Sequence, residues 1–265
     1  MLRFGSNDDK TILRKLSNDT LEKFKIFNSI PKEVDYNLVI TGTVGSGKTT
    51  LLESLSLLLK NNGHSPINFP EFLYTVNGEL SGELLRKKID QDISPLTFQS
   101  YILDMWENTL KVCYKNTGVK LYERCVDDSV ICFCNIDHHN DQLTLTELIS
   151  LYDKLRKTIS AYPNIPSYFN VNNFIKIQSG SLNENLQEIL SIIESDIKNG
   201  INKRIIGVEV SNMQSFERIK DRNRDGENNY CIDAVSLFNN HYNKLFKFLE
   251  NNQFIKSILD LQIFR

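Results

Sequence analysis

The residues best suited to chemistry form a glycine-rich turn at 42–49, which reads Gly-Thr-Val-Gly-Ser-Gly-Lys-Thr. Such glycines let successive backbone N–H groups turn inward around an anion, and a helix that follows adds its positive end. The spacing matches G-x-x-x-x-G-K-S/T without a mismatch. Lys48 is therefore expected to reach the β- and γ-phosphates, and the Thr49 hydroxyl to hold Mg²⁺. The motif predicts a nucleoside triphosphate site without specifying the reaction, with contacts from Gly42, Thr43, Val44, Gly45, Ser46, Gly47, Lys48, Thr49 and Thr50.

The neighbouring residues predict a strand before this turn and a helix after it. Residues 37–41 are a short apolar run, and residues 50–59 place Leu at helical spacing. Further strands are expected over 66–70, 119–122, 172–177 and 204–210, with a last short one over 254–259. Helices are expected over 82–88, 95–114, 127–135, 145–159, 182–197, 216–224 and 232–251. This alternation predicts an α/β fold, a doubly wound five-stranded parallel sheet with helices on both faces.

The composition narrows the class of protein. Of the 265 residues, 40% are hydrophobic, with 15 Phe and 10 Tyr, which excludes wholesale disorder. The balance of 31 basic and 33 acidic side chains argues against a nucleic-acid partner. No apolar run approaches the roughly 20 residues that cross a bilayer, so no membrane partner is expected. Five cysteines and the absence of an apolar leader pattern favour reduced thiols and a cytoplasmic, intracellular protein.

Four further segments carry groups that phosphate transfer needs, at the expected ends of strands or in helices above them. They read Phe-Pro-Glu-Phe at 69–72, Leu-Thr-Phe-Gln-Ser-Tyr at 96–101, Tyr-Glu-Arg-Cys at 122–125, and an arginine-rich stretch at 218–227. Together with the turn, they resemble the deoxynucleoside kinase family, which includes the herpesvirus thymidine kinases, over residues 36–250. The resemblance implies a P-loop kinase with an Arg-rich lid at about 216–228. It also implies a homodimer whose partners are ATP and a deoxynucleoside, with Mg²⁺ as cofactor, and it is compatible with a viral protein in host-cell cytoplasm.

This resemblance gives each catalytic group a coherent role. Phosphorylating a 5′-hydroxyl requires a base, and Glu71 at the end of the second strand is placed to take the proton. Glu123 would bind Mg²⁺ together with Thr49. Arg124 and Lys48 would stabilise the transferring phosphoryl group. Arg222 and Arg224, among the basic residues of the lid, would close over the triphosphate.

The nucleoside contacts follow in the same way. Gln99 offers a planar carboxamide for a base edge, and Phe133 lies where relatives carry a Phe that stacks on the base. By the resemblance, Glu227 would accept the 3′-hydroxyl, whereas the Tyr that relatives use for it falls near Lys88 or Ile89. Ser129 is a small residue, as in thymidine-preferring relatives. Ile102 and the bulky Trp106 would shrink the pocket, which predicts thymidine first and deoxycytidine second.

Two other functions remain open from the sequence. A thymidylate kinase has the same loop and a similar lid, but would want additional arginines near the acceptor, for which Arg86 is the candidate. A non-catalytic nucleotide-binding module is the other alternative. A zinc site built from Cys125, Cys132 and Cys134 with nearby histidines lacks the usual ligand spacing, so no such site is expected. We expect an N-terminal arm at 1–33, one kinase-like domain at 34–265, and an additional segment at 163–203 that supplies an edge strand and helix.

Overall fold

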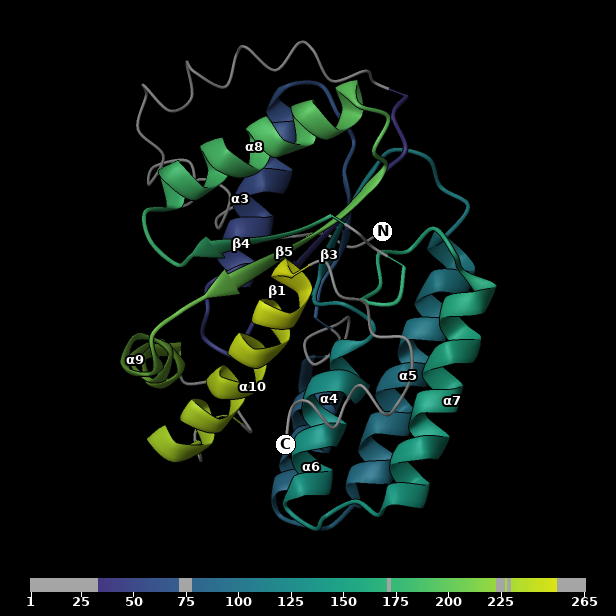
Figure 1. Cartoon of the computed structure of the whole chain (residues 1–265), viewed down its shortest axis with the longest axis vertical. Helices are drawn as coiled ribbons and strands as arrows, with labels where there is room; N and C mark the ends of the chain where they lie inside the picture. The colour runs from purple at the N-terminus through teal and green to yellow at the C-terminus, as the bar shows by residue number, and fades with distance from the viewer. Residues whose placement is uncertain (1–32, 72–77, 171–172, 223–226, 228–229, 252–265) are drawn as a thin grey trace.

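Five parallel strands form the central sheet of the protein, whose computed structural model describes residues 33–71, 78–170, 173–222, 227 and 230–251. The strands lie in the order β2-β3-β1-β5-β4, with β1 in the middle (Figure 1). Parallel neighbours need crossover connections, and helices supply them. The strands are β1 (Tyr36–Thr41), β2 (Ile67–Phe69), β3 (Val119–Glu123), β4 (Phe174–Gln178) and β5 (Lys203–Glu209). The predicted five-stranded parallel sheet is confirmed.

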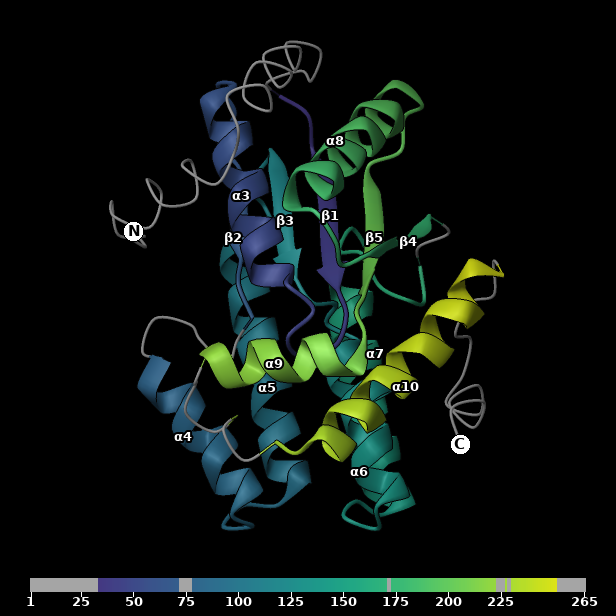
Figure 2. The same ribbon diagram turned by 90° about the vertical axis from the view of Figure 1, so that its left-hand side faces the viewer.

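Helices cover both faces of this sheet, again as the alternation in the sequence predicts. Figure 2 looks onto the face covered by α3 and α8, while α5 and α7 lie behind the strands. The helices are α3 (Lys48–Asn61), α4 (Gly78–Ile89), α5 (Pro95–Cys113), α6 (Asn135–His139), α7 (Leu145–Ala161), α8 (Leu182–Lys198), α9 (Asn212–Arg222) and α10 (Ile232–Glu250), with a π-helix, η3 (Ser129–Cys134).

Strand β1 separates the two hydrophobic cores. All six of its residues are buried. Leu38 and Ile40 point to the core formed with α3 and α8, whereas Val39 points to the core formed with α5, α7 and α10. A strand buried on both faces has an apolar run instead of an alternating pattern, which is what residues 37–41 show. The carboxyl end of β1 leads directly into the glycine-rich turn.

Local capping fixes where helices α5 and α7 begin. The Ser94 hydroxyl accepts a hydrogen bond from the Thr97 backbone, and Pro95 occupies the first turn, where no N–H partner is needed. Thr144 and Glu147 form a reciprocal capping box at the start of α7. The Ser94 cap fixes the first residue of α5 and so the positions of Gln99 and Trp106 along this helix.

The structure differs from the sequence prediction most clearly after β3. The helix expected over 127–135 forms, but most of it is the π-helix η3, which continues without a break into α6. The apolar spacing of a π-turn and an α-turn differs by a fraction of a residue per turn, so hydrophobic pattern alone does not separate them. Helices α4 and α9 begin four residues earlier than expected, at Gly78 and Asn212. The strand expected at 254–259 and almost all of the arm at 1–33 lie outside the described residues.

The segment 163–203 contains an edge strand and a helix, β4 and α8. Strand β4 pairs with β5, and Ser181 caps the start of α8. Gly207 of β5 allows this packing, because an added Cβ would lie 2.8 Å from ring atoms of both Phe174 and Phe246. In the described part of the chain, every helix is too short or too polar to cross a membrane.

Candidate active site

The glycine-rich turn curls between β1 and α3 as the motif predicts. Gly42, Gly45 and Gly47 all have positive φ, a backbone conformation that other residues rarely adopt. A Cβ on Gly42 would lie 2.5 Å from the Val208 carbonyl oxygen, and one on Gly45 would lie 2.5 Å from that of Ser215. The loop is thus pressed against β5 on one side and α9 on the other, which leaves room only for glycine.

Lys48 reaches across this loop from the first turn of α3. Its Nζ donates to the Thr43 carbonyl oxygen at 2.6 Å and to Ser46 Oγ at 3.4 Å. Burial, followed by the charge of Arg124, lowers the pKa of Lys48 to about 7 against opposing contributions from Glu71 and Glu123. A phosphate would add negative charge beside this ammonium group and favour its protonated form.

An open cavity lies over the loop. Two arginines of α9, Arg218 and Arg222, reach it from the opposite side. Arg218 Nη1 donates to Ser179 Oγ at 2.7 Å and to the Gly45 carbonyl oxygen at 3.3 Å. We call this space the phosphate cavity; its lining is Val44, Gly45, Gly47, Lys48, Thr49, Thr50, Glu53, Glu71, Glu123, Arg124, Arg218 and Arg222.

The two residues predicted to hold Mg²⁺ are neighbours in this cavity. Thr49 Oγ1 donates to Glu123 Oε1 at 2.6 Å. Glu123 is the last residue of β3 and is buried, and its other oxygen accepts from the Glu71 backbone N–H at 3.4 Å. A hydroxyl and a carboxylate beside a phosphate site are the hard oxygen ligands that Mg²⁺ prefers, so the residues present fit this ion.

Glu71 and Arg124 form an ion pair beside the loop. Arg124 Nε donates to Glu71 Oε1 at 2.5 Å, and Arg124 Nη1 donates to the Gly42 carbonyl oxygen and the Tyr242 hydroxyl at 2.7 and 2.8 Å. Arg124 is a non-glycine residue with a φ of 77°. Strained backbone of this kind persists only where the surroundings hold it, and it concentrates at functional sites.

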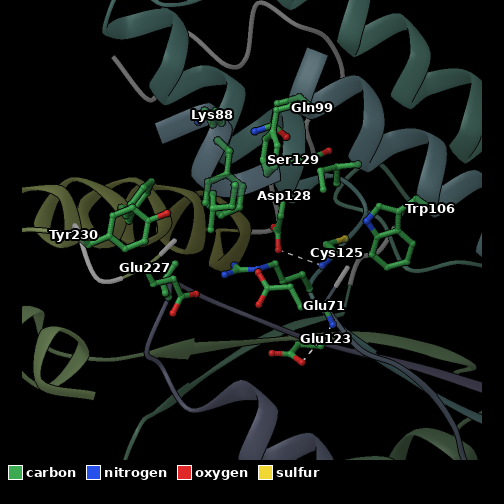
Figure 3. A pocket seen from close by; sticks show the side chains of 17 residues that line it. Glu71, Lys88, Gln99, Trp106, Glu123, Cys125, Asp128, Ser129, Glu227 and Tyr230 are labelled. Carbon is green, nitrogen blue, oxygen red and sulfur yellow. Dashed lines mark hydrogen bonds and ion pairs between the residues drawn. The ribbon is translucent and has the colours of Figure 1, made fainter. Parts of the chain in front are cut away.

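A second cavity continues from the first toward α4 and α5. We call it the acceptor cavity. It shares four residues with the phosphate cavity, which are Val44, Glu71, Glu123 and Arg124. All six side chains predicted to contact a nucleoside line it (Figure 3): Gln99, Ile102, Trp106, Ser129, Phe133 and Glu227. The structure therefore brings the two sets of predicted residues together at Glu71 and Arg124.

Five aromatic side chains line the acceptor cavity, namely Phe98, Trp106, Phe133, Tyr230 and Phe238. Trp106 is almost fully buried and stacks on Tyr122, with ring centroids 6.3 Å apart. Phe133 packs edge-on against Phe238, and the Arg124 guanidinium lies 5.2 Å from the centre of the Phe133 ring. Flat apolar walls with few polar groups are typical of a site for a planar ligand.

Glu227, which the resemblance assigns to the 3′-hydroxyl, lines this cavity. It is buried and forms an ion pair with Arg222, which links the two cavities a second time. Tyr230, beside it, also lines the acceptor cavity, and burial followed by the charge of Glu227 raises the pKa of its hydroxyl. Arg224, by contrast, lies outside the described residues.

Sequence reasoning missed a network of buried acids beneath the acceptor cavity. Asp128 lines the cavity and accepts from Thr41 Oγ1 at 2.6 Å and from the Tyr168 hydroxyl at 2.5 Å. Its neighbour Asp127 accepts from Ser167 Oγ and the Tyr168 backbone at 2.9 Å each. Burial raises the pKa of both carboxyls, that of Asp127 to about 6. Only the consecutive acids after β3 were visible in the sequence, without their partners from residues 163–170.

Three further cavity residues, Arg218, Lys88 and Tyr230, have no role assigned in the sequence analysis. Arg218 and Lys88 line their cavities from helices α9 and α4, whereas Tyr230 lines the acceptor cavity from two positions before α10. Helical spacing of basic residues is equally typical of a solvated face, so the pattern carries no signal that separates Arg218 from Lys220.

Comparisons with known proteins agree with this fold. The chain matches the family model for deoxynucleoside kinase over residues 38–199. No curated protein matches it. It is similar to solved structures of deoxyadenosine kinase from M. mycoides. With dCTP bound, the identity is 17%, the match covers 82% of this chain and 86% of that one, and the TM-score is 0.50. With dCMP and dCDP bound, the corresponding values are 18%, 86%, 93% and 0.50.

At these identities the structural likeness shows a shared fold. The family model, however, matches more than half of the chain. The matched residues include most of β1, the glycine-rich loop, α5, β3 and α7. These segments carry most of the residues described above. The chain therefore belongs to the deoxynucleoside kinase family, a family of phosphotransferases.

Proposed function

We propose that the protein transfers the γ-phosphate of ATP to the 5′-hydroxyl of a deoxynucleoside and so produces the 5′-monophosphate for nucleotide salvage. One observation carries this proposal. The phosphate cavity and the acceptor cavity meet at Glu71 and Arg124, so a hydroxyl in one space would face a terminal phosphate in the other. In-line transfer requires this juxtaposition of acceptor, base and phosphate. The family resemblance adds a homodimer to the proposal, and the cysteine usage adds a cytoplasmic location.

Glu71 is the proposed general base. It reaches both cavities, and its ion pair with Arg124 orients the carboxylate through one oxygen. A carboxylate oxygen of Glu71 would accept the proton of the 5′-hydroxyl as the new oxygen–phosphorus bond forms and the bond between the γ-phosphorus and ADP breaks. Arg124 is tied to the phosphate loop through Gly42, so its charge stays where negative charge develops during transfer.

Lys48 and the arginines of α9 would neutralise the phosphates. In this proposal, the backbone N–H groups of residues 42–50 bind the β- and γ-phosphates of ATP. Lys48 lies across this loop, and its Nζ donates to the Thr43 carbonyl oxygen. Arg218 and Arg222 approach from the other side, and Arg224 of the same stretch is assigned with them. Thr49 and Glu123 would hold Mg²⁺, which when bound screens the charge of the phosphate oxygens.

The acceptor cavity supports a pyrimidine nucleoside, with thymidine preferred over deoxycytidine. Gln99 would read the base edge and Phe133 would stack on its face, while Glu227 would accept the 3′-hydroxyl. Ile102, Trp106 and Ser129 set the size of the space around the base. Trp106 is held against Tyr122, and its bulk disfavours the larger purines.

A panel of acceptors with radioactive ATP tests the function directly. Deoxynucleosides and their 5′-monophosphates would be compared at matched concentration. We expect a labelled monophosphate product from thymidine and a weaker one from deoxycytidine. Phosphorylation of dTMP but not of thymidine would instead establish a thymidylate kinase. Arg86, the residue considered for that function, is exposed on α4 and does not line the acceptor cavity. Binding of ATP without any phosphorylated product would indicate a non-catalytic module.

A further inference from the structure

An ion pair that the proposed mechanism does not use lies at the far end of the acceptor cavity. Lys88, near the end of α4, lines this cavity, and its Nζ donates to Asp137 Oδ1 of α6 at 2.8 Å. The ammonium group also lies 5.8 Å from the centre of the Phe98 ring. Figure 3 shows Lys88 beside Gln99, at the end of the cavity away from Glu71 and Glu123. The pair thus lies at the base end of the site.

Asp137 is itself buried, with 4% of its surface exposed. Its Oδ2 atom is buried and has no hydrogen-bond partner among the described residues. Burial raises the pKa of this carboxyl, while Lys88 and the nearby Gln99 carboxamide lower it. Gln99 lies beside Lys88 at this end of the cavity (Figure 3), and so near the carboxylate that holds Lys88. A carboxylate attracts the amide nitrogen of Gln99 and repels its oxygen, which leaves that oxygen to face the cavity.

The polar groups at this end consequently present a fixed pattern. Lys88 has three N–H donors, and Asp137 accepts one of them. Beside it, the Gln99 oxygen is an acceptor. A donor next to an acceptor complements a ring carbonyl next to a ring N–H. Thymine and uracil carry that pair at C4 and N3, whereas cytosine carries an amino group and an unprotonated nitrogen there.

We infer that the Lys88–Asp137 pair selects bases with a 4-carbonyl group, with Lys88 donating to that oxygen and Asp137 holding both Lys88 and Gln99 in place. The inference rests on the proposed function. It adds hydrogen bonding to the base as a determinant of specificity, beside the size of the acceptor cavity. Asp137 is a positioning residue in this scheme, because it acts through Lys88 and Gln99. A buried donor that loses its acceptor costs more than a lost apolar contact, which makes such a pair selective.

The test compares thymidine, deoxyuridine and deoxycytidine as acceptors for the wild type and Lys88→Met. We expect kcat/KM for thymidine and deoxyuridine to fall about tenfold to hundredfold, as for loss of a hydrogen bond from a charged donor. The value for deoxycytidine should change less than about threefold. Lys87→Met is the matched control, because Lys87 pairs with Glu83 on the exposed side of α4 and does not line the cavity.

Lys88→Met leaves Asp137 without its cation, so folding is checked by thermal denaturation. If the single variant does not fold, the double variant Lys88→Met/Asp137→Leu, which removes both charges, replaces it in the acceptor assay. Asp137→Asn should lower the thymidine-to-deoxycytidine ratio of kcat/KM while Lys88 is still present. An equal loss for all three nucleosides would overturn the inference. So would a loss with thymidine that disappears with 3′-deoxythymidine, because Lys88 would then act on the sugar.

The two proposals fail in different ways. If the wild type phosphorylates no nucleoside, the proposed function is wrong, whatever the variants do. If it phosphorylates nucleosides and the preference among thymidine, deoxyuridine and deoxycytidine is the same in Lys88→Met, only the inference about the ion pair is wrong.

Discussion

Glu71 and Arg124 meet at the junction of the two cavities, with Arg124 Nε donating to Glu71 Oε1 at 2.5 Å. The guanidinium group also donates to the loop at Gly42 and to Tyr242 of α10. One guanidinium therefore ties the proposed base, the phosphate loop and a helix of the core into one arrangement. The position of the carboxylate is set by elements far apart in the chain, and a small displacement of any of them would move it.

Replacing Glu71 by Gln tests its role as a base. Gln keeps the size and an acceptor for Arg124 but cannot take a proton at neutral pH. We expect kcat to fall about 10²-fold or more, with ATP binding nearly unchanged. Steady-state rates and calorimetric titration with ATP measure the two quantities. Glu107→Gln, at an exposed pair with Lys111 on α5, is the control for loss of a carboxylate. Unchanged turnover in Glu71→Gln would remove the base from the mechanism.

Thr49 and Glu123 should determine the requirement for Mg²⁺. Their side chains are in direct contact, so Thr49→Val removes both a hydroxyl ligand and the donor to Glu123. We expect the Mg²⁺ concentration for half-maximal rate to rise about tenfold in Thr49→Val and in Glu123→Gln. Titrating MgCl₂ at constant free ATP measures this shift. A curve that superposes on that of the wild type would place the ion elsewhere.

The pKa of Lys48 predicts how ATP affinity depends on pH. In the free protein this pKa is about 7, and bound phosphates would raise it, so ATP binding takes up a proton above pH 7. The affinity should then fall by up to about tenfold per unit from pH 7 to 9, and level off below pH 7, where Lys48 is already protonated. Calorimetry in two buffers of different ionisation enthalpy would detect the proton. Lys48→Met should bind ATP weakly and without this slope; an equal slope in the variant would assign the proton to another group.

Helix α9 offers three basic residues for a matched comparison. Arg218 and Arg222 line the phosphate cavity, whereas Lys220 does not, and its Nζ lies 5.3 Å from the centre of the Phe216 ring. Arg218→Met and Arg222→Met should each raise KM for ATP about tenfold or more, because each removes a charged donor to phosphate. Lys220→Met should stay within about twofold. Equal effects at all three positions would mean that only the net charge of the helix matters.

Trp106 should set the upper size limit of the base. Trp106→Leu is expected to lower the free energy of unfolding by about 2–4 kcal/mol, since the side chain is buried against Tyr122. Chemical denaturation measures this cost. In the protein that remains folded, kcat/KM for deoxyadenosine should rise relative to thymidine. Met105→Leu, a volume-conserving change next to it on α5, is the control. A wild type that already phosphorylates purines as well as thymidine would contradict the size argument.

The sequence predicted the parts of the site that depend on short-range spacing. The loop at 42–49 and its flanking strand and helix form as expected, because glycine positions and hydrophobic periodicity are local properties. Glu123 and Arg124 follow β3 at the edge where parallel strands end together, and this placed them beside the loop. Gln99 and Trp106 share a face of α5 through the 3.6-residue repeat.

The rest depends on contacts between distant segments. The Tyr168 hydroxyl reaches Asp128 across 40 positions, and Asp137 meets Lys88 across 49. Neither partner carries a local signal that names the other. The positive φ of Arg124 and the π-turn of η3 are likewise imposed by packing, since nothing in residues 124–134 favours them over ordinary helix. The ion pairs and the unusual backbone conformations at the site can therefore be identified only from the three-dimensional structure.

The close approach of α9 to the glycine-rich loop has a mechanical consequence. Ser215 Oγ donates to the Val44 carbonyl oxygen at 2.5 Å, and Gly45 has no side chain to hold the two backbones apart. The loop and helix α9 are thereby fixed to each other. Any adjustment of the loop to an incoming nucleotide is transmitted rigidly to the arginines on that helix, so the anion and its counter-charges are aligned in a single movement.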